Sequence, residues 1–269
     1  MKVVAVIGVT GGAGATTAAA NLSAALAWQK RDTLTFDFCA TNALRLHFGM
    51  AWADDAGFAR QLLNGQEWHT AAYRDGKDRP FVPFGALAHD DELERLTTAL
   101  REQPHWFKSR LASVQLDSDA VVVCDCPSMP SVLREQVLAA ADLVLLVCAP
   151  DPLSYARATD IVARIAASSV KSRQDRDTPI LPALIVLNGF DSARRLDRDI
   201  ALLLRTQYRP VFSPVLVHRD ESLREALACK QMVLDFAPSS QAAYDFTALA
   251  TWTLARLGQQ QVKQRKQAA

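Results

Sequence analysis

The sequence predicts an α/β fold in which helices cover a doubly wound, mostly parallel sheet. Short apolar runs recur along the chain, and uninterrupted runs of this kind are typical of strands buried on both faces. Longer segments with helical periodicity separate the runs, and this alternation favours a parallel sheet. The 269 residues, 49% of them apolar, suffice for one sizeable core in a single larger domain.

Seven apolar runs are the expected strands. In chain order they are VVAVIGV (3–9), TLTFDF (33–38), FVPFG (81–85), AVVVCD (120–125), LVLLVCA (143–149), PALIVLN (182–188) and VFSPVLV (211–217). The segments between them carry the helical patterns, at residues 15–29, 41–48, 55–64, 89–101, 104–115, 130–141, 153–169, 193–207, 221–229 and 239–257. No long Gly, Ser or Pro linker divides the chain, so we expect one domain over 1–258. The low-complexity tail over 259–269 is expected to be disordered.

The charge balance and the pattern of apolar residues limit the classes of function that this chain can have. Lys and Arg total 30 against 29 for Asp and Glu, so no overall charge draws the chain to nucleic acid or anionic lipid. Lys2 is followed by an apolar run of only six residues, VVAVIG, and no stretch reaches the length of a membrane span. The five cysteines lie mostly within apolar runs, which suits a reducing compartment. We therefore expect a soluble, cytoplasmic protein.

A glycine-rich segment, VTGGAGATT, joins the first expected strand to an Ala-rich helix at residues 9–17. Glycines let consecutive backbone N–H groups point inward, and the following helix N-terminus favours an anion. Thr16 stands where a phosphate-binding loop places a magnesium-binding hydroxyl, and Thr17 is in reach of a phosphate oxygen. The strict Walker pattern would have glycine in place of Val9 and lysine in place of Ala15. These nine residues alone also fit a turn that only packs a strand against a helix.

Four landmarks occur in the order and spacing of a known family. GG-x-G-x-TT follows the first expected strand, FDFCATNALRL the second, CDCP an interior strand and VLNG a late one. Together they resemble the MinD and ParA family of deviant-Walker P-loop ATPases. A closer resemblance is to the BcsQ (YhjQ) proteins, the MinD-like proteins of bacterial cellulose-secretion systems. The segments that carry it are GVTGGAGATT, DFCATNALRLHFG, LLNGQEW, PFG and LVHRDESLREALACKQMV.

The resemblance implies a site for ATP and Mg²⁺. The nucleotide-binding residues we expect are Thr10, Gly11, Gly12, Ala13, Gly14, Ala15, Thr16, Thr17, Arg157, Asn188 and Arg219. The metal site it implies consists of Thr16, Asp37 and Asp125, directly or through water. Within the family the late Asn contacts adenine; a plainer interpretation of Asn188 is a residue that ends a strand.

Three charged groups that serve hydrolysis in the wider family are missing. A lysine that opens the loop is replaced by Thr10, the P-loop lysine by Ala15, and a second switch aspartate by Cys39. A lysine about 4 Å from a phosphate charge contributes on the order of 4 kcal/mol at an effective dielectric near 20, before desolvation is subtracted. Losing two such cations impairs phosphoryl transfer more than binding. We therefore expect absent or very slow hydrolysis and assign no catalytic residue.

A replacement cation is then needed, and Arg157 is the candidate. It follows LVLLVCAP, and the carboxyl ends of strands form the ligand face of such sheets. Two alternatives stay open: a cation supplied by a partner, and a merely solvated Arg157 on the first turn of its helix.

The function implied by the resemblance is an ATP-binding assembly factor for the bacterial cellulose synthase and secretion complex. In the family, two protomers enclose two nucleotides, so a homodimer is implied. A small companion subunit similar to BcsR, and contact with the synthase at the cytoplasmic face of the inner membrane, are implied as well, with recruitment to that membrane or the cell pole. The alternative is an active MinD- or ParA-type ATPase that positions cargo or partitions DNA.

Other features have plainer interpretations. A helix near residue 200 carries four arginines, but aspartates interleave with them, which favours a solvated face over direct nucleic-acid binding. These residues are Arg194, Arg195, Arg198 and Arg205 with Asp191, Asp197 and Asp199. The tail has only Leu257 and Val262 as sizeable apolar residues, so no autonomous membrane insertion is expected. Cys124 and Cys126 should point into the core rather than bind metal. Trp52, Trp68 and Trp106 are expected to be packing residues.

Overall fold

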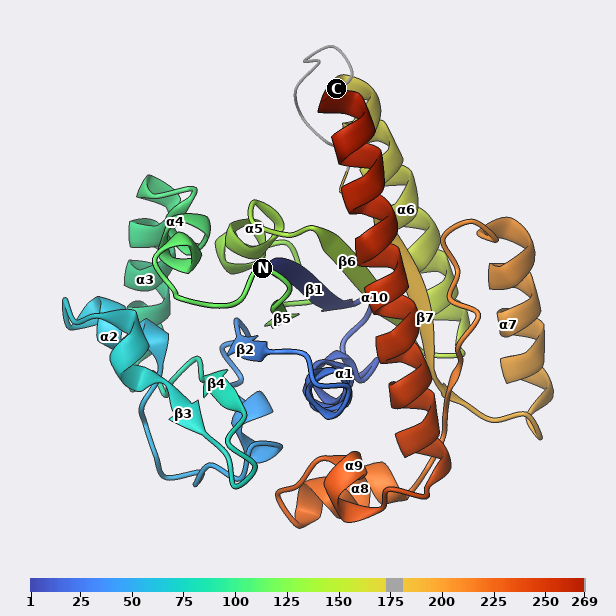
Figure 1. The fold of residues 1–269 in the computed structure, drawn as a ribbon, viewed down its shortest axis with the longest axis horizontal. Coiled ribbons are helices and arrows are strands. Elements are labelled where there is room, and N and C mark those ends of the chain that lie inside the picture. Colours follow the sequence, from blue (N-terminus) through green and yellow to red (C-terminus); the bar gives the residue numbers. More distant parts are fainter. Residues whose placement is uncertain (173–180, 269) are drawn as a thin grey trace.

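The computed structural model describes residues 1–172 and 181–268, and its centre is an eight-stranded sheet (Figure 1). The strand order is β3-β4-β2-β5-β1-β6-β7-β8. The strands are β1 (Lys2–Gly8), β2 (Thr33–Asp37), β3 (Tyr73–Arg74), β4 (Pro80–Val82), β5 (Val121–Cys126), β6 (Leu143–Cys148), β7 (Ala183–Phe190) and β8 (Val217–His218). β3 pairs with β4 in antiparallel fashion, and the pairings from β4 through β8 are parallel. The predicted mostly parallel α/β fold is confirmed.

Helices cover both faces of the sheet, as in a doubly wound fold. They are α1 (Ala15–Trp28), α2 (Phe58–Leu63), α3 (Asp90–Glu102), α4 (Trp106–Ala112), α5 (Val132–Leu138), α6 (Pro152–Ser172), α7 (Arg195–Gln207), α8 (Ser222–Ala228), α9 (Val233–Phe236) and α10 (Gln241–Ala268). One hydrophobic cluster joins α1, α9 and α10 to the sheet, and a second joins α2 through α7 to its opposite face (Figure 1).

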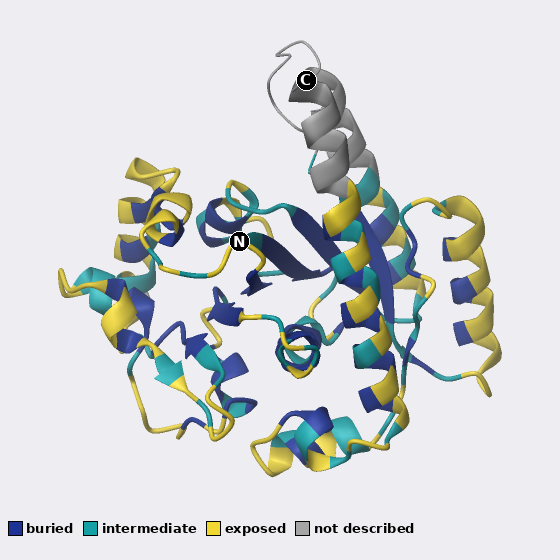
Figure 2. Cartoon of the chain, viewed as in Figure 1, coloured by how far each residue is buried: buried dark blue, intermediate teal, exposed yellow. Residues whose placement is uncertain are grey.

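The central strand shows why the apolar runs are continuous. In β1, Val3, Ala5 and Ile7 belong to the cluster under α2 through α7, whereas Val4 and Val6 belong to the cluster under α1 and α10. Figure 2 shows the same pattern as buried strands between helices whose outer sides are exposed. Because each face of the strand is covered, neither alternate position can be polar.

The segment predicted to be helical at 41–48 forms only a 3₁₀ turn, at Leu44–Leu46. Asn42 has a φ of 50°, in the left-handed region, which interrupts a helix. The backbone N–H of Leu44 donates to Asp37 Oδ2 over 3.2 Å. The carboxylate at the end of β2 therefore holds this loop in a turn instead of a longer helix.

The last expected strand, 211–217, is also shorter than predicted. Only Val217–His218 forms β8, while Phe212 makes an isolated bridge to Ile185 of β7. Pro214 lies between these contacts, and proline has no N–H to give to a sheet. β3 was not predicted, because two residues carry no readable period.

The tryptophans divide into two kinds. Trp68 and Trp106 are buried in an aromatic cluster around Phe36 and Phe58, as predicted. The prediction for Trp52 was wrong: its side chain is 60% exposed and lies under the guanidinium of Arg45, 4.3 Å from the ring centroid. Stacking on a buried arginine explains how this ring holds its place without entering the core.

Helix α10 continues as a helix to Ala268, into the segment 259–269 that the sequence predicts to be disordered. Side chains from residue 260 onward lie outside the described part, so the domain boundary at 258 stays a prediction. Among the described helices, none has the length and apolar composition that crossing a bilayer requires.

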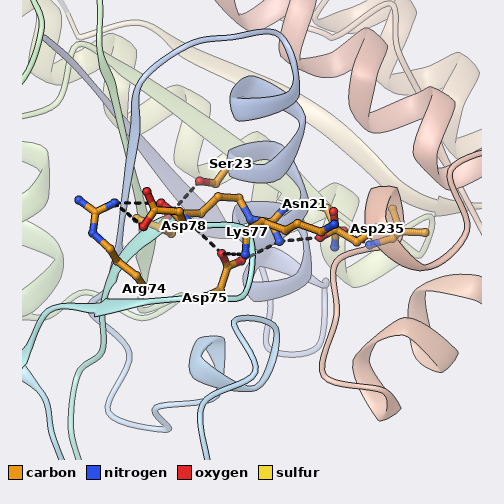
Figure 3. A network of polar contacts seen from close by, with 10 residues as sticks. Asn21, Ser23, Arg74, Asp75, Lys77, Asp78 and Asp235 are labelled. Atoms are coloured by element: carbon orange, nitrogen blue, oxygen red, sulfur yellow. Dashed lines mark hydrogen bonds and ion pairs between the residues drawn. The ribbon is translucent and has the colours of Figure 1, made fainter.

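A partly buried ion network fixes the edge of the sheet to the C-terminal helices. The guanidinium of Arg79, in the β3–β4 turn, binds Asp75 at 2.7 Å and Asp235 of α9 at 2.5 Å. Figure 3 shows Asp75 near the middle of this network, with Asn21 and Asp235 to its right. Asn21, on α1, accepts a hydrogen bond from the N–H of Val233 over 2.8 Å. The hairpin, α1 and α9 are thus held together.

Candidate phosphate and metal site

The glycine-rich loop leaves the end of β1 and enters α1 in a shape that fits an anion. Gly12 and Gly14 have φ values of 79° and 86°, which L-residues with side chains adopt at a cost. Gly14 is the N-cap residue of the 14-residue helix α1, and no side chain caps that terminus. Its free N–H groups and the helix dipole are therefore available to a negatively charged ligand. Gly11 and Gly12 are exposed at the mouth of the loop.

Asn188 holds the far side of this loop. Its Nδ2 donates to the carbonyl of Ala13 over 2.8 Å. A Cβ atom on Gly14 would lie 2.3 Å from the same nitrogen. The side chain therefore supports the loop directly, in addition to standing near the end of β7, where the sequence places it.

Two carboxylates lie side by side at the ends of neighbouring strands. Asp37 of β2 is in register with Asp125 of β5, and their side chains are 0% and 1% exposed. The hydroxyl of Thr16 donates to Asp125 Oδ2 over 2.7 Å. Asp37 accepts the backbone N–H of Cys39 over 2.8 Å and that of Leu44 over 3.2 Å. The predicted trio of Thr16, Asp37 and Asp125 is thus brought together at the start of α1.

This pair is electrostatically costly in the absence of a cation. Burial raises the pKa of Asp125 to about 6, and the hydrogen bond from Thr16 only partly opposes that shift. Burial and the neighbouring charge of Asp125 raise the pKa of Asp37 well above its ordinary value. Within the described residues, neither carboxylate forms an ion pair. Buried charges without partners favour a bound cation.

The free lone pairs of the trio fit a hard divalent ion. Asp125 Oδ1 is buried without a hydrogen-bond partner in the described structure. Thr16 adds a hydroxyl oxygen, and Asp37 a second carboxylate. Magnesium prefers one or two carboxylates together with hydroxyl, water and phosphate oxygens. These residues could therefore hold Mg²⁺ beside an anion in the glycine loop.

The residue that opens the loop contacts α6. Thr10 Oγ1 lies 3.0 Å from Ser154 Oγ, and the Ser154 hydroxyl donates to Asp151 Oδ2 over 2.8 Å. Ser154 is fully buried, and its N–H also donates to Asp151. Sequence reasoning missed Ser154 and Asp151, because nothing in the LVCAPDPLS segment distinguishes them from an ordinary helix cap. They fix the position of the loop relative to α6.

The two predicted arginines lie at the same sheet edge without touching the loop. Arg157 is half-buried, one turn after Ser154 on α6, and its Nη2 lies 4.0 Å from Met129 Sδ. Arg219 follows β8 and is exposed, while its N–H donates to the carbonyl of Phe190 over 2.8 Å. Arg157 follows the carboxyl end of β6, as predicted, and Arg219 follows that of β8, but among the described residues neither guanidinium contacts the loop.

Comparison with known proteins identifies the family. Residues 1–254 match the family described as cellulose biosynthesis protein BcsQ. The chain belongs to the BcsQ family. It is 30% identical to BcsQ of Escherichia coli K12, over 94% of each chain. The predicted resemblance is therefore confirmed.

Solved structures of other proteins share the fold of this chain. MinD of Pyrococcus furiosus superposes with a TM-score of 0.70 at 20% identity, covering 93% of this chain and 97% of that one. Cobyrinic acid a,c-diamide synthase from Mycobacterium smegmatis, solved with ADP and magnesium, superposes with a TM-score of 0.71 at 22% identity, covering 93% of both chains. This chain thus has the MinD and ParA fold.

Cysteines surround the carboxylates of this BcsQ-family site. Cys124 and Cys126, on either side of Asp125, are buried in the core as predicted, and burial raises the pKa of both thiols. Cys39, which replaces a switch aspartate, is half-buried. Burial and the charges of Asp125 and Asp37 raise the pKa of Cys39 far above its ordinary value. In the metal-free protein this thiol is neutral at physiological pH.

The arginines around α7 are largely engaged with neighbouring groups. Arg194 lies 3.4 Å from Asp191 and Arg195 lies 3.7 Å from Asp199. Arg198 donates to the carbonyl of Ser192. Asp197, instead of facing solvent with them, is buried and accepts the N–H of Asp191 over 2.9 Å. The pairing agrees with the mixed-charge interpretation of this face.

Proposed function

We propose that this chain binds ATP with Mg²⁺ and holds it with little or no hydrolysis, as an assembly factor of the bacterial cellulose synthase and secretion complex. The observation that carries the proposal is the trio of Thr16, Asp37 and Asp125. These three side chains meet at the uncapped N-terminus of α1, where the loop offers backbone donors but no lysine. The divalent ion would offset the charges of the triphosphate and of the two carboxylates. The backbone N–H groups of the loop would bind the phosphates.

Each part of the nucleotide has a candidate partner. The backbone N–H groups of residues 11–17 face the phosphates, and Thr16 with the two carboxylates takes the metal. Asn188 and Arg219 lie toward the end of β7 and after β8, on the side we assign to the base. Arg157 supplies the positive charge that Ala15 lacks, by a change of rotamer on α6. Solved relatives of the fold carry ADP or an ATP analogue with magnesium, which supports this assignment.

Slow hydrolysis follows from what the site lacks. Ala15 brings no cation to the phosphates, and the Thr10 hydroxyl is engaged with Ser154 instead of reaching a partner's nucleotide. Cys39 is a neutral thiol, so it orients an attacking water less well than a carboxylate would. Phosphoryl transfer depends almost entirely on positioning and charge, and here both are reduced.

Family membership supports the biological setting. The BcsQ family is a family of cellulose biosynthesis proteins, and MinD-like folds support a dimer that encloses nucleotide. We propose a cytoplasmic homodimer with two ATP molecules between the protomers, a small companion subunit similar to BcsR, and recruitment to the inner-membrane synthase or the cell pole. ATP that is held and not consumed would keep such a dimer closed by mass action.

The deciding experiment combines calorimetry with phosphate release. Titration with ATP and Mg²⁺ should give heat for the wild type, and Thr16→Ala should weaken binding at least about tenfold, or roughly 1.4 kcal/mol. Thr16→Ser keeps the hydroxyl and is the matched control that should bind normally. No heat for the wild type together with its companion proteins would overturn nucleotide binding.

The role of Arg157 has its own test. Arg157→Glu reverses the charge on α6 and should weaken ATP binding by tenfold or more, whereas Arg205→Glu, on α7, should leave it unchanged. Equal ATP affinities for Arg157→Glu and wild type would indicate that a partner protein, and not Arg157, supplies the missing cation.

The alternative is a cycling ATPase of the MinD or ParA type. It requires steady phosphate release at ordinary ATPase rates, on the order of one per second or faster. A partition function would also require a salt-dependent shift of random duplex DNA. The partnered charges around α7 give this alternative little support.

A further inference from the structure

We propose that Asp37, Cys39 and Asp125 form a binding site for a thiophilic divalent cation such as Zn²⁺. This site forms without nucleotide. The proposal rests on the proposed function only in sharing the two carboxylates with Mg²⁺. Its new element is a sulfur ligand, which changes the class of metal that the pocket prefers.

The geometry fits one small ion. One ligand atom from each of the three residues can be chosen so that all lie within 4.8 Å of one another. Zinc binds carboxylate oxygen at about 2.0–2.2 Å and cysteine sulfur at about 2.3 Å, so neighbouring ligand atoms of a tetrahedral ion stand about 3.4–3.6 Å apart. Side-chain movements that bring the ligand atoms up to about 1 Å closer together would complete the contacts. A water molecule would then be the fourth ligand of a tetrahedral ion.

A second observation points into the same pocket. Asp125 is 1% exposed, and its Oδ1 lacks a hydrogen-bond partner among the described residues. Arg45, a nearby buried cation, donates instead to the carbonyls of Asp54 and Trp52. Asp125 Oδ1 thus keeps a free lone pair within the group of three possible metal ligands.

The thiol decides the metal class. Magnesium takes oxygen ligands only, whereas zinc and its relatives gain from a thiolate. On binding, the Cys39 sulfur bonds to the metal and its proton passes to solvent, with no change of oxidation state. Cys39 is held in place because its N–H donates to Asp37 over 2.8 Å, so two of the ligands are positioned by each other. A bound ion would tie the loop after β2 to β5.

Co²⁺ tests this site on the nucleotide-free full chain. The wild type should bind one Co²⁺ per chain and show the near-ultraviolet absorption of a cobalt thiolate, which one equivalent of Zn²⁺ should remove. Cys39→Ser should abolish this absorption and weaken Zn²⁺ binding, measured by calorimetry, tenfold or more. Cys229→Ser, which changes an exposed cysteine of α8's C-terminal end, is the matched control and should behave as wild type. Absence of the absorption in the wild type, or its loss only in Cys229→Ser, would overturn the proposal.

Competition separates this proposal from the proposed function. If the carboxylates are shared, saturating Mg²⁺ and ATP should weaken Co²⁺ binding to the wild type tenfold or more. Cobalt absorption in a protein that gives no heat with ATP and Mg²⁺ would support the thiophilic site while contradicting the nucleotide site. Normal ATP binding without cobalt absorption would do the reverse.

Discussion

Gly14 is the residue on which the loop depends most closely. It combines a left-handed φ of 86° with the approach of Asn188 to 2.3 Å from where a Cβ would stand. Gly11, three residues earlier, has open space around its Cβ position and a φ outside the left-handed region. The two glycines look equivalent in the sequence, yet their backbones place very different demands on a side chain.

Gly14→Ala should therefore lower the free energy of unfolding by about 1–3 kcal/mol, from backbone strain and displacement of Asn188. Gly11→Ala should change it by no more than about 0.5 kcal/mol. Urea unfolding of the nucleotide-free proteins measures both values. Equal stabilities of the two variants would contradict the geometry described for the loop.

Asp125 links pH to stability with a definite sign. Its pKa is about 6 in the folded chain against an ordinary 3.8, so between these values the folded state keeps a proton that the unfolded state has lost. Stability should then fall as pH rises from about 4 to 6. Asp125→Asn removes this loss and should make the nucleotide-free protein more stable at pH 7.5 by about 1–3 kcal/mol, with no difference below pH about 4. Urea unfolding across pH measures it; a wild-type curve parallel to that of Asp125→Asn would refute it.

Asp37→Asn is the contrasting variant at the same site. Both oxygens of Asp37 accept backbone N–H groups, so an amide nitrogen would leave one of those donors unpaired. We therefore expect Asp37→Asn not to show the gain in the free energy of unfolding that we expect for Asp125→Asn. A motif comparison can locate both carboxylates, but which of them tolerates an amide depends on contacts that only the structure supplies.

Among the elements, the segment before α2 and the segment after β4 cross at two glycines. A Cβ on Gly57 would lie 2.0 Å from the backbone nitrogen of Gly85, and one on Gly85 would lie 2.8 Å from the Cα of Gly57. The crossing lets Phe58 N and Ala59 N donate to the carbonyls of Pro83 and Phe84 over 3.0 Å each. Main chain packs on main chain here, with no room for a side chain.

Gly57→Ala should thus cost about 3 kcal/mol or more in the free energy of unfolding, because backbone and not a flexible side chain blocks the new methyl group. Gly76→Ala, in the β3–β4 turn, meets nothing within 4 Å and serves as the control. The midpoint of urea unfolding should drop for the first variant and stay near the wild-type value for the second. Similar midpoints would contradict the crossing.

Elements differ in how far the sequence predicts them. Strands β1, β5, β6 and β7 are predicted because a strand that is buried on both faces has a continuous apolar run in its sequence. The turn at Leu44–Leu46 and the short β8 are mispredicted because the carboxylate of Asp37 and the missing N–H of Pro214 decide them. Contacts such as Thr10 with Ser154, 144 residues apart, leave no local pattern at all.

For the whole molecule, the proposed closed dimer predicts a thermal signature. ATP with Mg²⁺ at about 100 times its Kd should stabilise the fold by about 2.7 kcal/mol, which raises Tm by roughly 5–10 °C for a chain of this size. AMP, without the outer phosphates, is the matched control and should have little effect. An unchanged Tm with ATP would remove the support for a nucleotide-held assembly.

Light scattering extends this prediction to time. Because hydrolysis is expected to be slow, ATP and a non-hydrolysable analogue should hold the same fraction of dimer over hours. A dimer that decays with ATP alone would favour the cycling ATPase.

The strand order also has a consequence for synthesis. Among the described strands, β1, which carries the glycine loop, pairs with β5 and β6 alone, whose residues begin at Val121 and Leu143. On the ribosome, β1 therefore waits for about 110 further residues, from Gly8 to Val121, before its first sheet partner is made. Until then, the apolar residues of β1 are available to chaperones. The glycine loop has not yet taken the shape that binds an anion.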